Sequence, residues 1–217
     1  MSLKTAPLGL LHLGVGNLTS VANVLKKMDI AYELVQRPED LVKVNKVLFP
    51  GVGSFDHAVQ GLKKFELWDP LKELLSSRRI SFLGICLGAQ MLLDSSDEGL
   101  ERGMGIIPGK VRKLNTGSTS LKIPHVGWNQ VVPTSAYQGH SLFQNLPLSP
   151  RGLEFYFVHS YIMHPHHPEH LVAQTEYGEN FCSILGRDNI WGVQFHPEKG
   201  HALGQKFLKN FALGASC

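Results

Sequence analysis

Residues 81–93 join an apolar run to a glycine-framed cysteine, and this stretch constrains the fold more than any other. The first half has the pattern of a buried strand, and the second half suits a helix. Cys86 lies at the join, with Gly84 two residues before it and Gly88 two residues after it, as in a nucleophile elbow. The glycines are expected because a sharp strand-to-helix turn leaves no room for a Cβ. The stretch predicts a reactive thiol at a helix N-terminus, where the helix dipole favours the thiolate.

A second interpretation of Cys86 is a small core residue, which is the common role of a buried cysteine. The chain has three cysteines, Cys86, Cys182 and Cys217. Their spacing does not match a disulfide framework or a zinc site. Reduced thiols are therefore expected, and with them a cytoplasmic protein.

The order of strand and helix patterns indicates an α/β fold with a parallel sheet flanked by helices. Strand patterns cover 8–13, 31–36, 46–49 and 81–86, and helix patterns cover 18–28, 55–64 and 67–77. Shorter strand patterns follow at 153–158, 171–175, 181–185 and 190–195, with a last helix at 199–211. We expect this extra β structure in the C-terminal half to extend the sheet or to form a second one. No break in composition divides the chain, so one domain over residues 1–217 is expected.

Composition and charge argue against several other classes of protein. The net charge is +3 with the two signs interspersed, so no nucleic-acid partner is expected. No stretch approaches the roughly 20 apolar residues of a membrane span. The segment 164–170 is rich in histidine, but its two prolines indicate a turn, and zinc-motif spacings are missing. Neither a metal nor another cofactor is therefore expected.

A base for the thiol is found in His196-Pro197-Glu198, which follows the strand pattern 190–195. In parallel sheets, reactive groups gather at the C-terminal ends of the strands. A thiol nucleophile needs a base, and the base needs an orienting acceptor. Cys86, His196 and Glu198 supply all three kinds of group. A surface histidine beside a helix-capping glutamate is the competing interpretation.

Gly84-Ile85-Cys86-Leu87-Gly88-Ala89-Gln90, together with His196-Pro197-Glu198, resembles the class I (triad-type) glutamine amidotransferases, which have a flavodoxin-like fold. The resemblance covers nearly the whole chain. It is strongest to the glutaminase subunits of imidazole glycerol phosphate synthase. The segments that carry this narrower resemblance are 50–55, 124–129, 155–161 and 196–199.

The resemblance implies a glutaminase with a Cys86-His196-Glu198 triad. Cys86 would form a glutamyl thioester, His196 would move the proton, and Glu198 would hold the imidazole. Backbone N–H groups of Leu87 and Val52 would bind the oxyanion, with the Val52 peptide reoriented when a partner binds. The substrate glutamine would be held by Gly51, Gly53, Gln90, Ser160 and Tyr161.

The implied partner is a (β/α)8-barrel cyclase subunit in a heterodimer. It would receive the ammonia and make imidazole glycerol phosphate and an aminoimidazole carboxamide ribotide in histidine biosynthesis. Asn17, Trp128, Asn129 and Lys199 would face this partner. The chain departs from the family pattern at His12-Leu13, Ile162 and Gly200-His201, none of which belongs to the triad.

Three other functions remain open from the sequence. The chain could feed ammonia to a related cyclase in surface-sugar amidination. It could be a free-standing cysteine hydrolase or peptidase, which would act without a partner. It could also be a regulatory subunit without catalysis, although the intact triad residues favour an enzyme.

Overall fold

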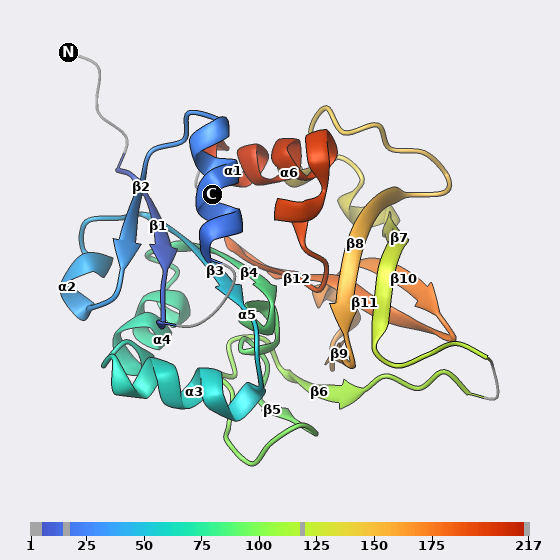
Figure 1. Ribbon diagram of the computed structural model, residues 1–217, viewed down its shortest axis with the longest axis horizontal. Helices are drawn as coiled ribbons and strands as arrows, with labels where there is room; N and C mark the ends of the chain where they lie inside the picture. Colours follow the sequence, from blue (N-terminus) through green and yellow to red (C-terminus); the bar gives the residue numbers. More distant parts are fainter. Residues whose placement is uncertain (1–5, 15–17, 118–119, 215–217) are drawn as a thin grey trace.

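The computed structural model describes residues 6–14, 18–117 and 120–214, and its centre is one mixed β-sheet (Figure 1). The main path across the sheet is β2 (Tyr32–Val35), β1 (Leu8–Leu11), β3 (Lys46–Gly51), β4 (Ser81–Cys86), β12 (Ile190–Val193), β11 (Glu179–Arg187), β10 (Leu171–Tyr177), β7 (His125–Pro133) and β8 (Leu153–His159). Off this path, β6 (Gly109–Lys113) pairs with β5 (Ser95–Ser96) and with β9 (Tyr161–Pro165), which also pairs with β11.

The strands from β2 to β12 are parallel, and those from β12 onward are antiparallel. The predicted α/β class and parallel sheet are thus confirmed, and the β structure of the C-terminal half extends the same sheet. The helices are α1 (Leu18–Lys27), α2 (Pro38–Leu41), α3 (Phe55–Lys64), α4 (Trp68–Ser76), α5 (Leu87–Gln90) and α6 (His201–Leu213). Short 3₁₀ turns cover Ser135–Tyr137, Ser141–Phe143, Pro168–His170 and Pro197–Lys199.

Helices cover both faces of the parallel part of the sheet, and two apolar cores result. In Figure 1, α1 and α6 lie on one side of β1, β3 and β4, and α3 and α4 lie on the other. Val21 of α1 and Phe207 of α6 belong to the first core, and Leu62 of α3 and Leu71 of α4 belong to the second. No helix in the described ranges is long and apolar enough to span a bilayer.

Several element boundaries differ from the expected ones. The strand expected at 190–195 ends at Val193, so His196 lies in the connection that follows it. The long strand β7 over residues 125–133 was not predicted, because it has no regular apolar alternation. The last helix begins at His201, after a 3₁₀ turn, rather than at Lys199.

Serine is a frequent helix N-cap, so a capping side chain would be expected at Ser54, but the structure shows a different cap for α3. Ser54 occupies the N-cap position of α3, but its hydroxyl makes no capping hydrogen bond. The Phe55 N–H instead donates to Oε2 of Glu98, at 2.8 Å. A carboxylate is a stronger acceptor than a hydroxyl at this positive helix end. The capping role of Glu98 could not be predicted from the sequence, because Glu98 is far from α3 along the chain.

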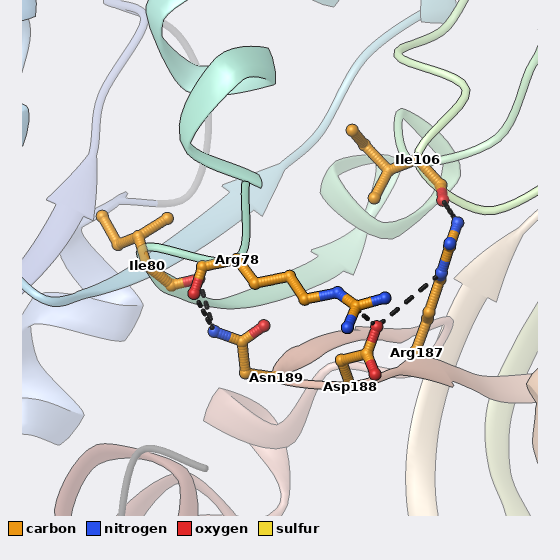
Figure 2. A network of polar contacts seen from close by, with 6 residues as sticks. All are labelled: Arg78, Ile80, Ile106, Arg187, Asp188 and Asn189. Carbon is orange, nitrogen blue, oxygen red and sulfur yellow. Dashed lines mark hydrogen bonds and ion pairs between the residues drawn. The ribbon is translucent and has the colours of Figure 1, made fainter. Parts of the chain in front are cut away.

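Figure 2 shows how the β11–β12 turn is tied to the start of β4. The Asn189 carboxamide donates to the carbonyl oxygens of Arg78, at 3.1 Å, and Ile80, at 3.0 Å. The same turn carries Asp188, which forms an exposed ion pair with the Arg78 side chain at 2.9 Å. The buried Asn189 carboxamide therefore holds the start of β12 beside β4. His196 follows β12 along the chain.

We expect Asn189→Ala to lower the free energy of unfolding by about 2 kcal/mol, because the buried Ile80 carbonyl and the partly buried Arg78 carbonyl lose their donor. Denaturant unfolding followed by circular dichroism measures this change. The matched control is Arg78→Ala, which breaks the neighbouring exposed ion pair and should cost less than about 1 kcal/mol. Equal losses in the two variants would contradict the role given to the carboxamide.

Candidate active site

Cys86 sits on a strained turn between β4 and α5. Its backbone has φ 53° and ψ −110°, a left-handed conformation that a residue with a Cβ rarely adopts. A Cβ added to Gly84 would lie 2.3 Å from the Gly88 carbonyl oxygen. A Cβ added to Gly88 would lie 2.1 Å from the Phe49 carbonyl oxygen. The predicted steric reason for both glycines therefore applies to backbone atoms, which cannot move aside as a flexible side chain can.

The Gly88 contact leads to a stability prediction. Gly88→Ala should lower the free energy of unfolding by about 3 kcal/mol or more, because β3 and α5 must separate to admit the methyl group. Gly139→Ala is the control, since a Cβ there meets no atom within 4 Å and its φ is not positive. Thermal unfolding of both variants provides the test. A Gly88→Ala protein as stable as the control would show that the close packing of the elbow is not required.

His196 and Glu198 form a buried pair next to Cys86. Strand β12 runs parallel to β4 with Val193 opposite Ile85, so the chain leaving β12 arrives beside the elbow. His196 Nδ1 and Glu198 Oε1 are 2.8 Å apart, and both side chains are almost fully buried. The other ring nitrogen, Nε2, is buried without a hydrogen bond to any described residue, so it is left for the thiol or a substrate.

The electrostatics of His196 favour the imidazolium form. Burial alone lowers its pKa, but the Cys86 side chain and the Glu198 carboxylate outweigh burial and raise the pKa to about 9. The imidazolium charge is compensated by the Glu198 carboxylate, which lies 2.8 Å from Nδ1. The three residues therefore have the electrostatics that a nucleophilic thiol requires.

Two buried glutamines connect the elbow to β9. Gln90 Nε2 donates to the Tyr161 carbonyl oxygen and to Gln194 Oε1, at 3.1 Å in both cases. Gln194 Nε2 in turn donates to Cys86 Sγ at 3.6 Å. Gln194 is fully buried, and its position between two amide groups gave no signal in the sequence.

A cavity of about 390 Å³ opens above the thiol. The predicted site residues that line it are Val52, Gly53, Cys86, Leu87, Gln90, Ser160, Tyr161, His196 and Lys199. Further lining residues that the sequence did not single out are Glu98, Pro124, Val158 and His159. A cavity of this size fits a small polar molecule, and its wall carries both a carboxylate and an ammonium group. Residues from distant parts of the chain thus meet at the Cys86 sulfur.

Comparison with known proteins gives the cavity a family context. The family model "Glutamine amidotransferase class-I" matches residues 10–215. The chain belongs to the class I glutamine amidotransferases. Imidazole glycerol phosphate synthase subunit HisH of Leptospira interrogans is 42% identical over 207 residues, covering 94% of this chain and 98% of the relative. The corresponding subunit of Leptospira borgpetersenii is 40% identical, with the same coverage.

A solved structure supports the same fold. A protein described as "Crystal structure of glutamine amidotransferase" superimposes with a TM-score of 0.70. The match covers 94% of this chain and 98% of that chain, at 15% sequence identity. The enzyme is therefore a class I glutamine amidotransferase in fold as well as in sequence, and within that family it groups with the HisH subunits.

The loop after β3 forms one wall of the amidotransferase cavity. Val52 lines the cavity and is partly exposed, and Gly53 has a φ of +109°. Gly51 is not on the wall, and a Cβ there would lie 2.4 Å from the Gly88 backbone nitrogen. Gly51 therefore packs β3 against α5, while Val52 and Gly53 face the space above the sulfur. The Leu87 N–H lies at the start of α5, directly after the thiol.

Two of the residues expected to face a partner, Trp128 and Lys199, both lie against the Tyr156 ring, and Lys199 lines the cavity. Trp128 of β7 is 44% exposed and stacks on His201, with ring centroids 5.6 Å apart. Lys199 is exposed, with its Nζ 4.7 Å from the centre of the Tyr156 ring. Asn129 is on the opposite face of β7 from Trp128, and donates to the Glu176 carbonyl oxygen at 2.9 Å. Asn17 lies outside the described residues.

Proposed function

We propose that this chain is the glutaminase subunit of an imidazole glycerol phosphate synthase of histidine biosynthesis. The observation that carries the proposal is the buried His196–Glu198 pair beside Cys86 on a strained elbow. The HisH relatives, about 40% identical over almost the whole chain, supply the synthase to which such a glutaminase would belong.

In the first half of the reaction, the Cys86 sulfur attacks the carboxamide carbon of glutamine. The backbone N–H groups of Leu87 and Val52 stabilise the negative charge that develops on the amide oxygen. The tetrahedral intermediate collapses as the C–N bond breaks, and His196 gives its proton to the departing nitrogen. Ammonia leaves, and a glutamyl thioester remains on Cys86.

In the second half, the now neutral His196 takes a proton from a water molecule that attacks the thioester carbon. The C–S bond breaks, glutamate is released, and the imidazole proton restores the starting pair with the sulfur. Glu198 stabilises the charged imidazole whenever it forms. Because Glu198 is bonded to Nδ1, it also keeps Nε2 directed toward the reaction.

The cavity wall matches the amino-acid end of glutamine. The Gln90 side chain and the backbone at Ser160 and Tyr161 offer hydrogen bonds, and the Glu98 carboxylate complements a substrate ammonium group. Lys199 complements a substrate carboxylate. This polar wall favours a free amino acid over a residue within a peptide, whose α-amino and α-carboxyl groups are joined in amide bonds and carry no charge.

The proposed partner is a (β/α)8-barrel cyclase in a cytoplasmic heterodimer. The exposed apolar side chains around the rim, Val52, Val126, Trp128 and Val158, form a surface that a partner could cover. Ammonia released inside a covered cavity reaches the second subunit without mixing with solvent. Reorientation of the Val52 peptide on binding would complete the oxyanion site.

Release of glutamate from glutamine tests this function. The purified chain is assayed alone, with the barrel cyclase of the same organism, and with that cyclase plus its nucleotide substrate. Little release alone and strong release in the complex are expected. Strong release by the chain alone would favour an autonomous amidase, and activation only by a surface-sugar cyclase would assign the chain to that reaction.

Trp128→Ala tests the partner face. We expect the affinity for the cyclase to fall about tenfold or more, because exposed tryptophans are frequent anchors of interfaces. The unfolding temperature of the isolated chain should change little. The control is Leu100→Ala, at a 97% exposed position that does not line the cavity. Unchanged affinity and unchanged coupling of the two reactions would remove Trp128 from the interface.

A further inference from the structure

Strands β7 and β8 form a two-stranded ribbon with two different faces. Val126 pairs with Val158, and Trp128 pairs with Tyr156, on the outer face that the proposed cyclase would cover. His125 pairs with His159 at the same end of the ribbon, and alternation turns these side chains to the inner, buried face. The reaction derived above uses neither histidine.

His125 and His159 lie within hydrogen-bonding distance of each other, and each has one further hydrogen-bonding partner. His125 Nδ1 is 3.1 Å from His159 Nε2. His159 Nδ1 is 2.9 Å from the Tyr161 carbonyl oxygen. At the other end, Asn129 Nδ2 is 3.3 Å from His125 Nε2. His159 lines the cavity above the thiol, whereas His125 does not reach it.

Hydrogen-bonding rules fix which atom donates and which atom accepts in each hydrogen bond of this series. A carbonyl oxygen only accepts, so His159 Nδ1 must carry the proton. Both imidazoles are neutral near pH 7, because burial lowers the pKa of His125 to about 4 and that of His159 to about 3. A neutral imidazole has one N–H, so His159 Nε2 accepts from His125 Nδ1, and His125 Nε2 accepts from Asn129.

The Asn129 end requires the same direction independently. Asn129 Nδ2 also donates to the Glu176 carbonyl oxygen, at 2.9 Å, and Asn129 Oδ1 accepts from the Gln130 N–H at 2.7 Å. Its amide orientation is therefore set by two backbone groups. The Tyr161 carbonyl at one end and the Asn129 amide at the other therefore require the same arrangement, in which each histidine carries its proton on Nδ1.

On the side of the cavity, the series of hydrogen bonds continues from His159 to the Cys86 sulfur. The Tyr161 carbonyl oxygen accepts from Gln90 as well as from His159. Gln90 leads through Gln194 to Cys86 Sγ. One unbroken series of hydrogen bonds therefore joins the inner face of the ribbon to the sulfur, and it passes through the carbonyl beside the proposed glutamine subsite.

We propose that His125 and His159 are positioning residues, which hold the carbonyl of the Tyr161–Ile162 peptide, and with it the adjoining backbone of Ser160 and Tyr161, in the orientation that binds glutamine. They also connect this backbone to the partner-facing ribbon. This inference rests on the proposed glutaminase function. It also assigns Asn129 the role of hydrogen-bond donor to His125, at the end of the series that is farthest from Cys86, instead of direct contact with the cyclase. A displacement of the ribbon on partner binding would reach the glutamine subsite along this path.

Substitutions at His125 separate hydrogen bonding from packing, because His125 lies outside the cavity and stacks on Phe157 and Tyr177. His125→Asn places a donor near the former Nδ1 but removes the ring. His125→Phe keeps the ring stacking but removes the hydrogen bonds. If the chain of hydrogen bonds positions the subsite, Asn should be the better replacement. If His125 only fills space, Phe should be better.

The readout is the dissociation constant for glutamine, measured by calorimetry on the chain bound to its barrel cyclase. Cys86→Ala is present in every sample so that glutamine is not consumed. We expect His125→Phe to weaken glutamine binding roughly three- to tenfold, the effect of one lost hydrogen bond, and His125→Asn to restore most of it. Equal affinity of the Phe variant and the parent, or better binding by Phe than by Asn, would overturn the proposal.

Nitrogen NMR of labelled histidine gives a second readout that needs no glutamine. Near neutral pH, His125 and His159 should both be neutral with the proton on Nδ1. A proton on Nε2 of either ring would contradict the proposed series of hydrogen bonds. If the parent complex binds no glutamine, the glutaminase function fails, and the NMR result still decides whether the chain of hydrogen bonds exists.

Discussion

Cys86→Ala is expected to abolish glutamine-dependent synthesis by the complex while leaving synthesis from free ammonia intact. Without the sulfur no thioester forms, and the loss should be roughly 10⁴-fold or more in glutaminase turnover. The ammonia-dependent rate should stay within about a factor of two, because the proposed cyclase site is on the partner chain. Both rates are measured on the same preparation by following formation of imidazole glycerol phosphate.

The two-substrate design makes this prediction specific. Loss of the ammonia-dependent rate as well would show that the division of labour between the subunits is different. Cys182→Ala is the matched control. Cys182 is also buried, but burial holds the pKa of its thiol far above the usual range, so it cannot serve as a nucleophile. The control should keep both activities.

Glu198→Gln should lower the glutaminase turnover by roughly 10²- to 10⁴-fold and change its pH dependence. In the parent, the pKa of His196 is raised to about 9, so the imidazolium that protonates departing ammonia is present at neutral pH and is lost as the pH rises through 9. Removing the carboxylate charge removes one of the two interactions that raise this pKa. The alkaline limb of the rate profile should therefore shift about one unit or more toward lower pH.

The same substitution has a consequence for stability with a definite sign. A histidine with a raised pKa stabilises the folded protein fully below its unfolded pKa of 6.5, and this contribution disappears as the pH rises through about 9. Glu198→Gln should thus lose stability at pH 6 and lose less at pH 10. Glu39→Gln, at an exposed position on α2, is the control for the lost charge. An unchanged alkaline limb in Glu198→Gln would mean that Glu198 does not control the imidazole.

Local sequence patterns were sufficient for the elbow and the parallel half of the sheet. The Gly84 and Gly88 prediction needs only the steric size of a Cβ, and a predicted helix such as α3 over residues 55–64 has a clear apolar face. The separation of His196 and Glu198 by one proline similarly indicated a pair that could lie close together. These predictions succeeded because each depends on neighbours in the chain.

The parts that could not be predicted depend on contacts between distant residues. Glu98 replaces Ser54 as the cap of α3, and Gln194 meets Cys86, across more than 40 and more than 100 residues of chain respectively. Strand β7 was missed because its inner face buries the polar His125 as well as Val131, while its outer face exposes the apolar Val126 and Trp128. No local apolar period distinguishes such a strand from a loop.

The parallel pairing of β12 with β4 also has a consequence for synthesis of the protein. Until residues 190–193 have left the ribosome, the edge of β4 that β12 will occupy has no partner, and His196 does not yet exist beside Cys86. The nascent chain therefore carries the thiol without its base for more than half of its length. Activation of the Cys86 thiol by its proposed base is therefore expected only when translation is nearly finished, which would limit modification of this thiol in an incomplete chain.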